Sequence, residues 1–232
     1  MNIYTIRKPE IITDQQMDRY LSKIPMERQD RVGRYIRQED AIRSLCGSLL
    51  IQYVIQKELK EDNVTYSYNK YGKPFINEFP KFHYNISHSH DWVVCATDNI
   101  EVGIDIEKIK EIDLGIAKRF FAPIEYAQIE RRPSDQQLSC FYEYWTMKES
   151  FIKALGKGLS IPLNSFCIRE ENGEYITIDQ QSKVYLFNHI HLDKEYKLAV
   201  CSQQKTLDIE IHYLNFSDLD SIENSMYLNI QP

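Results

Sequence analysis

The sequence predicts an α+β fold of two similar halves, each with a principal helix packed on a mainly antiparallel sheet. Two long helical stretches occupy different halves of the chain, at 39–59 and 134–156. Both halves combine a long helix, a turn containing Gly and Lys, and several strand-like segments. A short aromatic, apolar and cysteine pattern at 91–96 is echoed at 196–201. Together these features favour an internal duplication, with a cleft between the halves.

Composition limits the classes of protein. The 232 residues are 43% hydrophobic and 27% charged, which is typical of a globular chain. A net charge of −6 argues against a general nucleic-acid binder. No segment has the roughly 18 apolar residues of a membrane span, and the N-terminus does not resemble a secretory signal. The five cysteines are widely spaced, as expected of reduced thiols. We therefore expect a cytoplasmic protein without membrane or nucleic-acid partners.

The first half is predicted to begin with a strand at 2–7, where residues alternate. Thr13 and Gln16 form a capping box for a short helix. A second helix at 27–37 leads into the principal helix at 39–59, which has a buried apolar stripe. Strand-like segments bounded by turn residues follow, and we expect one antiparallel sheet from 64–69, 82–87, 92–98 and 102–107.

The second half is predicted to start with two helices. Pro123 suits the first turn of a helix at 123–132, and Ser134 with Gln137 caps a helix that runs to about Gly156. Five strands are expected afterwards, at 165–171, 174–178, 184–190, 196–202 and 208–215. We place the halves at 1–104 and 105–215, followed by a polar tail at 216–232 that should be loose from about Asp218.

Two acids stand on one predicted strand. A period of two puts Asp105 and Glu107 on one face, whereas Ile104 and Ile106 face the core. An acidic edge facing solvent explains the pair. A hard divalent cation bound by both carboxylates is the alternative.

A third acid lies within an apolar helical stripe. Glu149 falls on the face defined by Phe141, Trp145, Ile152 and Leu155. A carboxylate there needs a proton, a partner or a metal, because an unpaired buried charge is costly. An ion pair with Lys153, four residues on, would satisfy it equally well.

Basic residues and histidines allow further interpretations. Cations gather at Arg28, Arg31, Arg34, Arg37 and Arg43, and again at Lys148, Lys153 and Lys157. These are solvated helix faces unless they converge on a cleft, where they would suit phosphates. Lys157 lacks the upstream glycine of a P-loop, which argues against Walker-type nucleotide binding. His88 and His90 form an H-x-H pair that leaves a zinc hydrolase open as an alternative.

Four motifs, taken in order, resemble those of the phosphopantetheinyl transferases of the Sfp (surfactin-synthetase-activating) type. They are 72–74 (GKP), 85–89 (NISHS), 102–107 (VGIDIE) and 145–150 (WTMKES) followed by Lys153. The resemblance implies a monomer that transfers 4′-phosphopantetheine from coenzyme A to a serine of an apo peptidyl or acyl carrier protein, as in nonribosomal peptide synthesis. It also implies release of 3′,5′-ADP. A protein that only binds coenzyme A or a carrier is the rival, and it predicts loss of one of the three acids.

The resemblance also assigns site residues. It implies Mg²⁺, with Mn²⁺ as the alternative, on Asp105, Glu107 and Glu149. Glu149 or a metal-bound water would accept the serine proton, Lys148 would orient that acceptor, and Lys153 would face the diphosphate. The implied coenzyme A contacts are Tyr71, Gly72, Lys73, Pro74, Ser87, His88 and Arg43, with Arg28 and Arg31 where close relatives carry lysines. The carrier would dock on 120–132 and on the stretch after Gly158.

Overall fold

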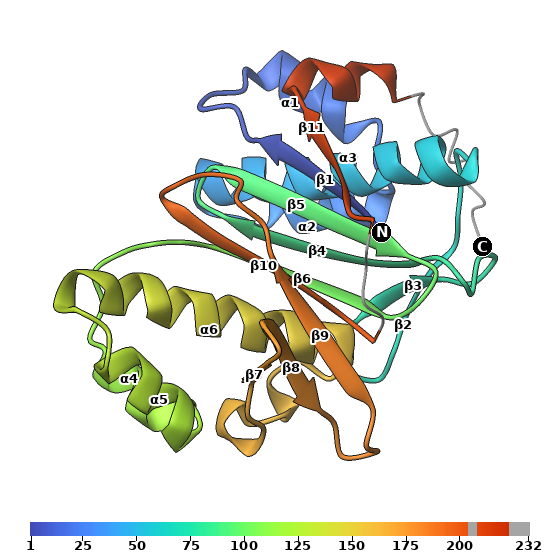
Figure 1. The fold of residues 1–232 in the computed structure, drawn as a ribbon. Coiled ribbons are helices and arrows are strands. Elements are labelled where there is room, and N and C mark those ends of the chain that lie inside the picture. Colours follow the sequence, from blue (N-terminus) through green and yellow to red (C-terminus); the bar gives the residue numbers. More distant parts are fainter. Residues whose placement is uncertain (204–207, 223–232) are drawn as a thin grey trace.

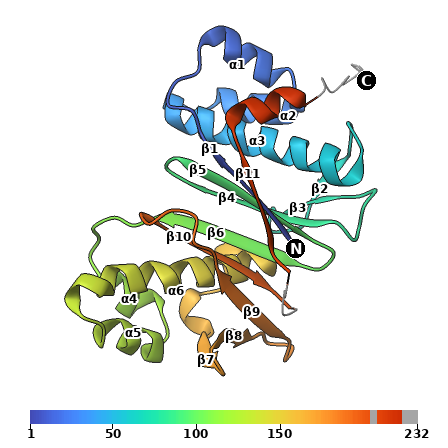
Figure 2. The same ribbon diagram turned by 45° about the horizontal axis from the view of Figure 1, so that its top comes forward.

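The computed structural model describes residues 1–203 and 208–222. Figures 1 and 2 show two halves stacked on each other, each with one long helix on its outer side. The predicted α+β architecture of two halves is confirmed.

The first half is a four-stranded sheet in the order β11-β1-β5-β4, covered by the long helix α3 (Gln38–Leu59). Its strands are β1 (Asn2–Arg7), β4 (His83–Ser89), β5 (Trp92–Asp98) and β11 (Glu210–Leu214). The smaller elements are α1 (Asp14–Leu21), α2 (Met26–Gly33), the hairpin of β2 (Tyr66–Tyr68) and β3 (Pro74–Ile76), and the 3₁₀ helix η3 (Phe216–Ser221). Leu45 and Leu49 of α3 pack on Tyr4 and Val93 of the sheet, which forms the first core.

The second half is a five-stranded sheet in the order β6-β10-β9-β8-β7, covered by α6 (Ser134–Ala154). Its strands are β6 (Val102–Lys108), β7 (Arg169–Glu171), β8 (Glu174–Ile178), β9 (Val184–His189) and β10 (Tyr196–Ser202). The short helices are α4 (Gly115–Phe120), α5 (Pro123–Glu130), η1 (Gly158–Ser160) and η2 (Leu163–Ser165).

The two sheets share a core of their own. Ile3 and Val94 of the first sheet pack with Ile104, Ile106 and Val200 of the second, and all five are fully buried. Because each strand alternates its side chains between faces, residues 103, 105 and 107 of β6 then face α6. The molecule is therefore layered as helix, sheet, sheet, helix, as Figure 2 shows.

Gly103 sets how closely α6 lies on β6. A Cβ atom there would stand 2.0 Å from the Ser150 carbonyl oxygen and 2.4 Å from the Ala154 nitrogen. Real Cβ atoms do not approach backbone so closely, so only glycine permits this contact. The close approach brings the side chains of α6 onto the acidic face of β6.

Three sequence-based expectations about the sheets and the tail are wrong. The segments 64–69 and 102–107 are not part of the first sheet, because β2 pairs with β3 in a separate hairpin and β6 pairs antiparallel with β10 of the second sheet. Conversely, β11 lies within the predicted second half but pairs parallel with β1. The tail is ordered as far as residue 222, because Leu219 and Ile222 are buried in the first core. The rest of the predicted tail lies outside the described residues. The division at 104/105 remains a prediction, and β6 runs across it.

Candidate active site

The edge of β6 meets side chains of β4 where the two halves join. Asn85, Ser87 and Ser89, which we call the β4 polar row, point from the first sheet toward this edge. Asn85 Oδ1 accepts the Ile104 N–H at 2.8 Å, Ser87 Oγ accepts the Ile106 N–H at 3.3 Å, and Ser89 Oγ accepts the Lys108 N–H at 3.1 Å. The strands belong to different sheets, and side chains of the row satisfy these three edge amides.

Asp105 is the most buried acid of the site, with 3% of its surface exposed. One of its oxygens, Oδ1, accepts a hydrogen bond from Ser87 at 2.9 Å and forms an ion pair with Lys153 Nζ at 2.5 Å. Lys153 also donates to Ser87 Oγ at 2.9 Å. Burial raises the pKa of Asp105, and the charge of Lys153 opposes that rise.

Glu107 and Glu149 lie near enough to Asp105 to interact with its charge. Ser89 donates a hydrogen bond to Glu107 Oε2 at 2.8 Å. The pKa of Glu107 is raised by burial and then by the charge of Asp105. Burial, followed by repulsion from Asp105 and Glu107, raises the pKa of Glu149 to about 7, against the opposing charge of Lys153. The structure thus brings all three predicted acids and Lys153 into one electrostatic cluster.

Lys153 does not form the expected ion pair with its helical neighbour. Lys153 pairs directly with Asp105 on β6. Its charge only lowers the pKa of Glu149 from a distance. Glu149 therefore keeps a carboxylate with a raised pKa at the junction, available to a proton or a cation.

A divalent cation fits the chemistry of these donors. In residues 1–203 and 208–222, no three His, Cys, Asp or Glu side chains already stand in a ligand arrangement. Lys153 forms an ion pair with one oxygen of Asp105. The other oxygen, Asp105 Oδ2, is buried and lacks a hydrogen-bond partner among the described residues. An unsatisfied buried carboxylate oxygen beside two more carboxylates is the kind of donor set that Mg²⁺ binds.

Cations surround His88, which is exposed on β4. Its pKa is lowered first by desolvation and then by the charges of Arg43, Lys153 and Arg31. Arg43 also pairs with Asp40 at 2.7 Å and donates to the His90 carbonyl at 3.2 Å. Of the predicted cations, Arg31 and Arg43 of the first half and Lys153 of the second therefore lie near His88. His90 adds no zinc arrangement to His88 within the described part of the chain.

Arg28 packs against Tyr66 of the first half. Its guanidinium stands 4.4 Å from the Tyr66 ring centroid, and its Nε is buried without a hydrogen-bond partner among the described residues. Arg28, which the resemblance names as a contact of coenzyme A, thus has an N–H group that is available to a ligand.

The predicted turn at Tyr71–Pro74 joins the two halves. Gly72 takes a φ of +89°, which glycine adopts without strain. Lys73 Nζ donates to the Val102 carbonyl at 3.1 Å and to the Ala154 carbonyl at 2.9 Å, and burial lowers its pKa to about 8. The lysine therefore fastens the turn to β6 and α6 with two of its three ammonium protons. Exposed Tyr71 and a hollow of about 260 Å³ lined by Lys73 and Pro74 lie at this junction.

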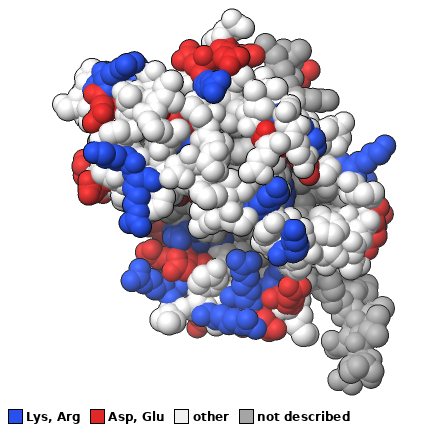
Figure 3. Space-filling view, turned by 90° about the horizontal axis from the view of Figure 1, so that it is seen from below, with Lys and Arg blue, Asp and Glu red and all other residues white. Residues whose placement is uncertain are grey.

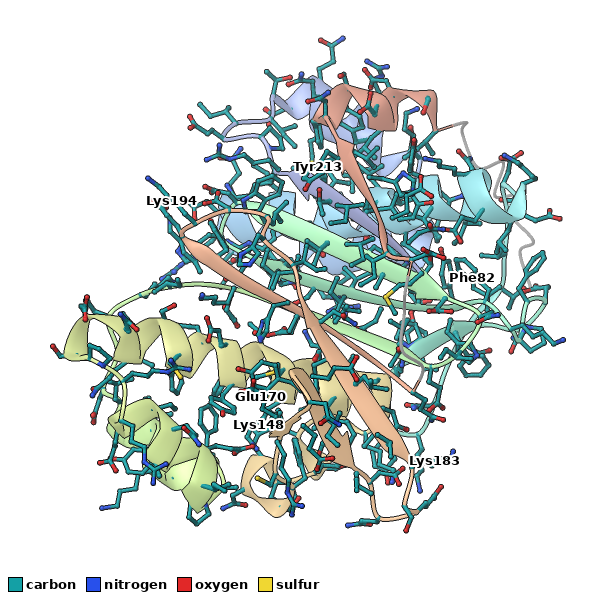
Figure 4. All side chains as sticks on the ribbon, viewed as in Figure 1. Phe82, Lys148, Glu170, Lys183, Lys194 and Tyr213 are labelled. Carbon is teal, nitrogen blue, oxygen red and sulfur yellow. The ribbon has the colours of Figure 1, made fainter. Side chains whose placement is uncertain are left out.

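Lys148 points away from the carboxylates, contrary to the expectation that it orients a proton acceptor. Its Nζ is fully buried, forms an ion pair with Glu125 at 2.8 Å and donates to the carbonyls of Leu163 at 2.8 Å and Phe166 at 3.1 Å. An ammonium group has three protons, and these contacts use all of them. Figure 4 shows Lys148 on the side of α6 away from the first half.

Sequence reasoning missed Glu125 and Ser89. Glu125 accepts hydrogen bonds from the amides of Ala122 and Ile168, both at 2.7 Å, besides pairing with Lys148. Nothing in the sequence singled out Glu125, because its partners Lys148 and Ile168 are distant along the chain. The signal for Ser89 was available, because polar residues recur with period two in the segment 85–89.

The region expected to meet a carrier protein exposes apolar side chains. Phe120, Ile124 and Leu159 are 40%, 57% and 77% exposed. Lys118 and Arg119 are exposed beside them. In Figure 3, basic and acidic residues are interleaved over the face seen from below.

Comparisons with known proteins identify the family. Residues 101–201 match the 4′-phosphopantetheinyl transferase superfamily, and residues 12–100 match the family "4′-phosphopantetheinyl transferase, N-terminal". The chain is 40% identical to 4′-phosphopantetheinyl transferase Sfp of Bacillus subtilis (strain 168), over 94% of this chain and 100% of that protein. It is 44% identical to 4′-phosphopantetheinyl transferase gsp of Aneurinibacillus migulanus, over 78% and 77%.

A solved structure is also similar in part. The holo-(acyl-carrier-protein) synthase of Bacillus anthracis str. Ames, solved in complex with CoA, matches 44% of this chain and 93% of its own at 19% identity and a TM-score of 0.39.

The matched families and the two-half fold define a transferase that acts on coenzyme A. The chain belongs to the Sfp-type 4′-phosphopantetheinyl transferases, which confirms the resemblance of its four motifs. It is an enzyme that moves phosphopantetheine from coenzyme A to carrier proteins.

Proposed function

We propose that the enzyme modifies a serine of apo peptidyl or acyl carrier proteins, and that Asp105, Glu107 and Glu149 bind the Mg²⁺ or Mn²⁺ it requires. One observation carries this proposal. Three carboxylates from two elements lie near one another at the junction of the halves. Burial raises the pKa of each, and repulsion from neighbouring carboxylates adds to the rise for Glu107 and Glu149. A cation removes that repulsion and gives Asp105 Oδ2 the partner it lacks.

Coenzyme A would bind in the cleft with its phosphates among the cations. The lowering of the His88 pKa by the charges of Arg43 and Arg31 supports a shared positive region. Arg28 contributes its buried Nε donor. The turn at Tyr71–Pro74 would hold the adenine against the exposed Tyr71 ring and the turn backbone, because two protons of the Lys73 ammonium already bind carbonyls of β6 and α6. Phosphate oxygens would accept hydrogen bonds from these side chains and neutralise their positive charge.

The transfer forms a bond between the carrier serine Oγ and the phosphorus that carries pantetheine, and it breaks the diphosphate bridge. Glu149, or a water held at the site, would accept the serine proton as general base. Lys153 stabilises the leaving 3′,5′-ADP, which keeps the bridging oxygen. A bound divalent cation supplies charge neutralisation on the diphosphate. Positioning of the two substrates contributes much of the rate.

The carrier protein would dock on the second half. Phe120, Ile124 and Leu159 offer an exposed apolar surface, and Lys118 and Arg119 offer positive charge to an acidic carrier helix. Both features suit a transient interface with an apolar centre and a polar rim.

We place the enzyme in the cytoplasm as a monomer, because both halves of the site lie in one chain. The thiols are consistent with a reducing compartment, since four of the five are buried. No helix among the described residues has the length and apolarity needed to cross a bilayer.

Mass spectrometry of a carrier protein tests the proposal. Purified enzyme is incubated with coenzyme A, Mg²⁺ and several apo peptidyl and acyl carriers, each of which is then weighed. We expect the mass of at least one carrier to increase by one phosphopantetheine group. We expect no increase when EDTA is present during the incubation. No gain on any carrier would contradict the proposed function.

Glu149→Gln is the matched variant for that assay. It keeps the shape of the side chain but removes its charge and its basicity. We expect turnover to fall by orders of magnitude while coenzyme A still binds, as measured by calorimetry. Unchanged turnover would remove Glu149 from the site.

A further inference from the structure

Two serines of the β4 polar row make the same pair of contacts, one step apart along the strand. Ser87 accepts the Ile106 N–H and donates to the carboxylate of the preceding residue, Asp105. Ser89 accepts the Lys108 N–H and donates to the preceding carboxylate, Glu107. A hydroxyl group can do both because it has one proton to donate and two lone pairs to accept with.

Asn85 extends the row by a third position. It accepts the Ile104 N–H at 2.8 Å, so each row residue contacts the amide 19 positions further along the chain. Residue 103 is a glycine, so no carboxylate precedes this amide. The constant offset fixes the register of β6 against β4, and hence of the second half against the first.

Glu107 depends on the row more than Asp105 does. Asp105 has an ion pair with Lys153 in addition to its serine. For Glu107, the hydrogen bond from Ser89 is the one direct side-chain contact found among the described residues. Ser89 is only 8% exposed, so water has little access to replace its hydroxyl. The orientation of Glu107 therefore rests on a rigid strand residue of the opposite half.

We propose that Ser89 is a positioning residue that aims the Glu107 carboxylate for cation binding, and that Asn85 supports it by holding the register of β6. This inference rests on the proposed function, because it concerns the same cation site. It assigns Ser89 a role distinct from contact with coenzyme A. Groups that orient a metal ligand typically change metal affinity by about 10–100-fold when removed.

Calorimetric titration of Mg²⁺ into the enzyme–coenzyme A complex tests the role of Ser89. Ser89→Ala should weaken Mg²⁺ binding by about 10-fold or more, whereas Ser89→Thr, which keeps the hydroxyl, should restore most of the affinity. Asn85→Ala should act in the same direction but less, because Asn85 contacts only the backbone. If Ser89→Ala does not fold, Ser89→Cys replaces it, since its thiol is a weak donor of similar size.

Ser48→Ala is the matched control. Ser48 is also a buried serine, but its Oγ donates to the Ser44 carbonyl within α3, in the first core. We expect Ser48→Ala to change the melting temperature without changing Mg²⁺ affinity. If Ser89→Ala does only the same, or if wild-type enzyme binds no Mg²⁺ beside coenzyme A, the inference is wrong. Failure to load any carrier would contradict the proposed function. The role of Ser89 would still be tested, because the Mg²⁺ titration does not depend on carrier loading.

Discussion

At the scale of single residues, the site is defined by carboxylates that the fold does not fully satisfy. Asp105 Oδ2 lacks a partner among the described residues, and Glu149 holds its proton to about pH 7. Folding normally pairs or solvates such groups, because an unsatisfied buried acid costs free energy. Their persistence here indicates that a ligand completes the site.

The raised pKa of Glu149 predicts a dependence of stability on pH in metal-free enzyme. An unfolded glutamate ionises near 4.5, whereas folded Glu149 ionises near 7. Its contribution to the free energy of unfolding is therefore complete below pH 4.5 and is lost as pH rises to about 7. We expect the melting temperature of wild-type enzyme in EDTA to fall across this window relative to Glu149→Gln. A constant difference between the two would contradict the raised pKa.

At the scale of elements, the site depends on how α6 lies on β6. Glu149 and Lys153 stand one turn apart on α6, and Gly103 allows that helix to contact the strand that carries Asp105 and Glu107. The helix, its acid and its lysine could be predicted from periodicity and capping. The closeness of the contact could not, because it is a property of two packed backbones.

Gly103→Ala tests this contact, with Gly47→Ala as its control. A Cβ at Gly103 would overlap backbone atoms of Ser150 and Ala154, so we expect a loss of about 1–3 kcal/mol or more of stability and a large loss of carrier loading. A Cβ at Gly47, in α3, would meet only Ile86 and Val93 side-chain atoms at 3.8 Å. That change should be neutral or stabilising by roughly 0.5–1 kcal/mol. Equal effects in chemical denaturation would contradict the argument.

The buried pair of Lys148 and Glu125 predicts a structural effect. Lys148→Met leaves Glu125 charged and fully buried, which should cost about 3–5 kcal/mol in the free energy of unfolding. Adding Glu125→Gln removes the orphaned charge, so the double variant should recover part of that loss. Urea denaturation of the three proteins measures both effects. If Lys148→Met keeps full stability and loses only turnover, the original assignment of Lys148 as a catalytic residue would be restored.

At the scale of the whole molecule, local sequence patterns predicted the helices and strands better than they predicted which sheet each strand joins. Both principal helices, most strands and the two-half α+β plan were expected from periodicity, caps and turns. The placement of β6 and β11 was wrong, because a strand's sequence does not say which sheet edge it joins. Asp105, Glu107, Glu149 and Lys153 interact electrostatically in the structure, and their role as one cation site stays a prediction. Lys148 does not join them as expected, since its partner Glu125 is distant in sequence.

Binding of Mn²⁺, followed by electron paramagnetic resonance in the presence of coenzyme A, tests the central claim most directly. The claim is that Asp105, Glu107 and Glu149 form one cation site. We expect wild-type enzyme to remove the signal of free Mn²⁺, and Asp105→Asn and Glu149→Gln each to weaken that binding by at least about 10-fold while the fold is kept. Unchanged Mn²⁺ affinity in both variants would contradict the claim.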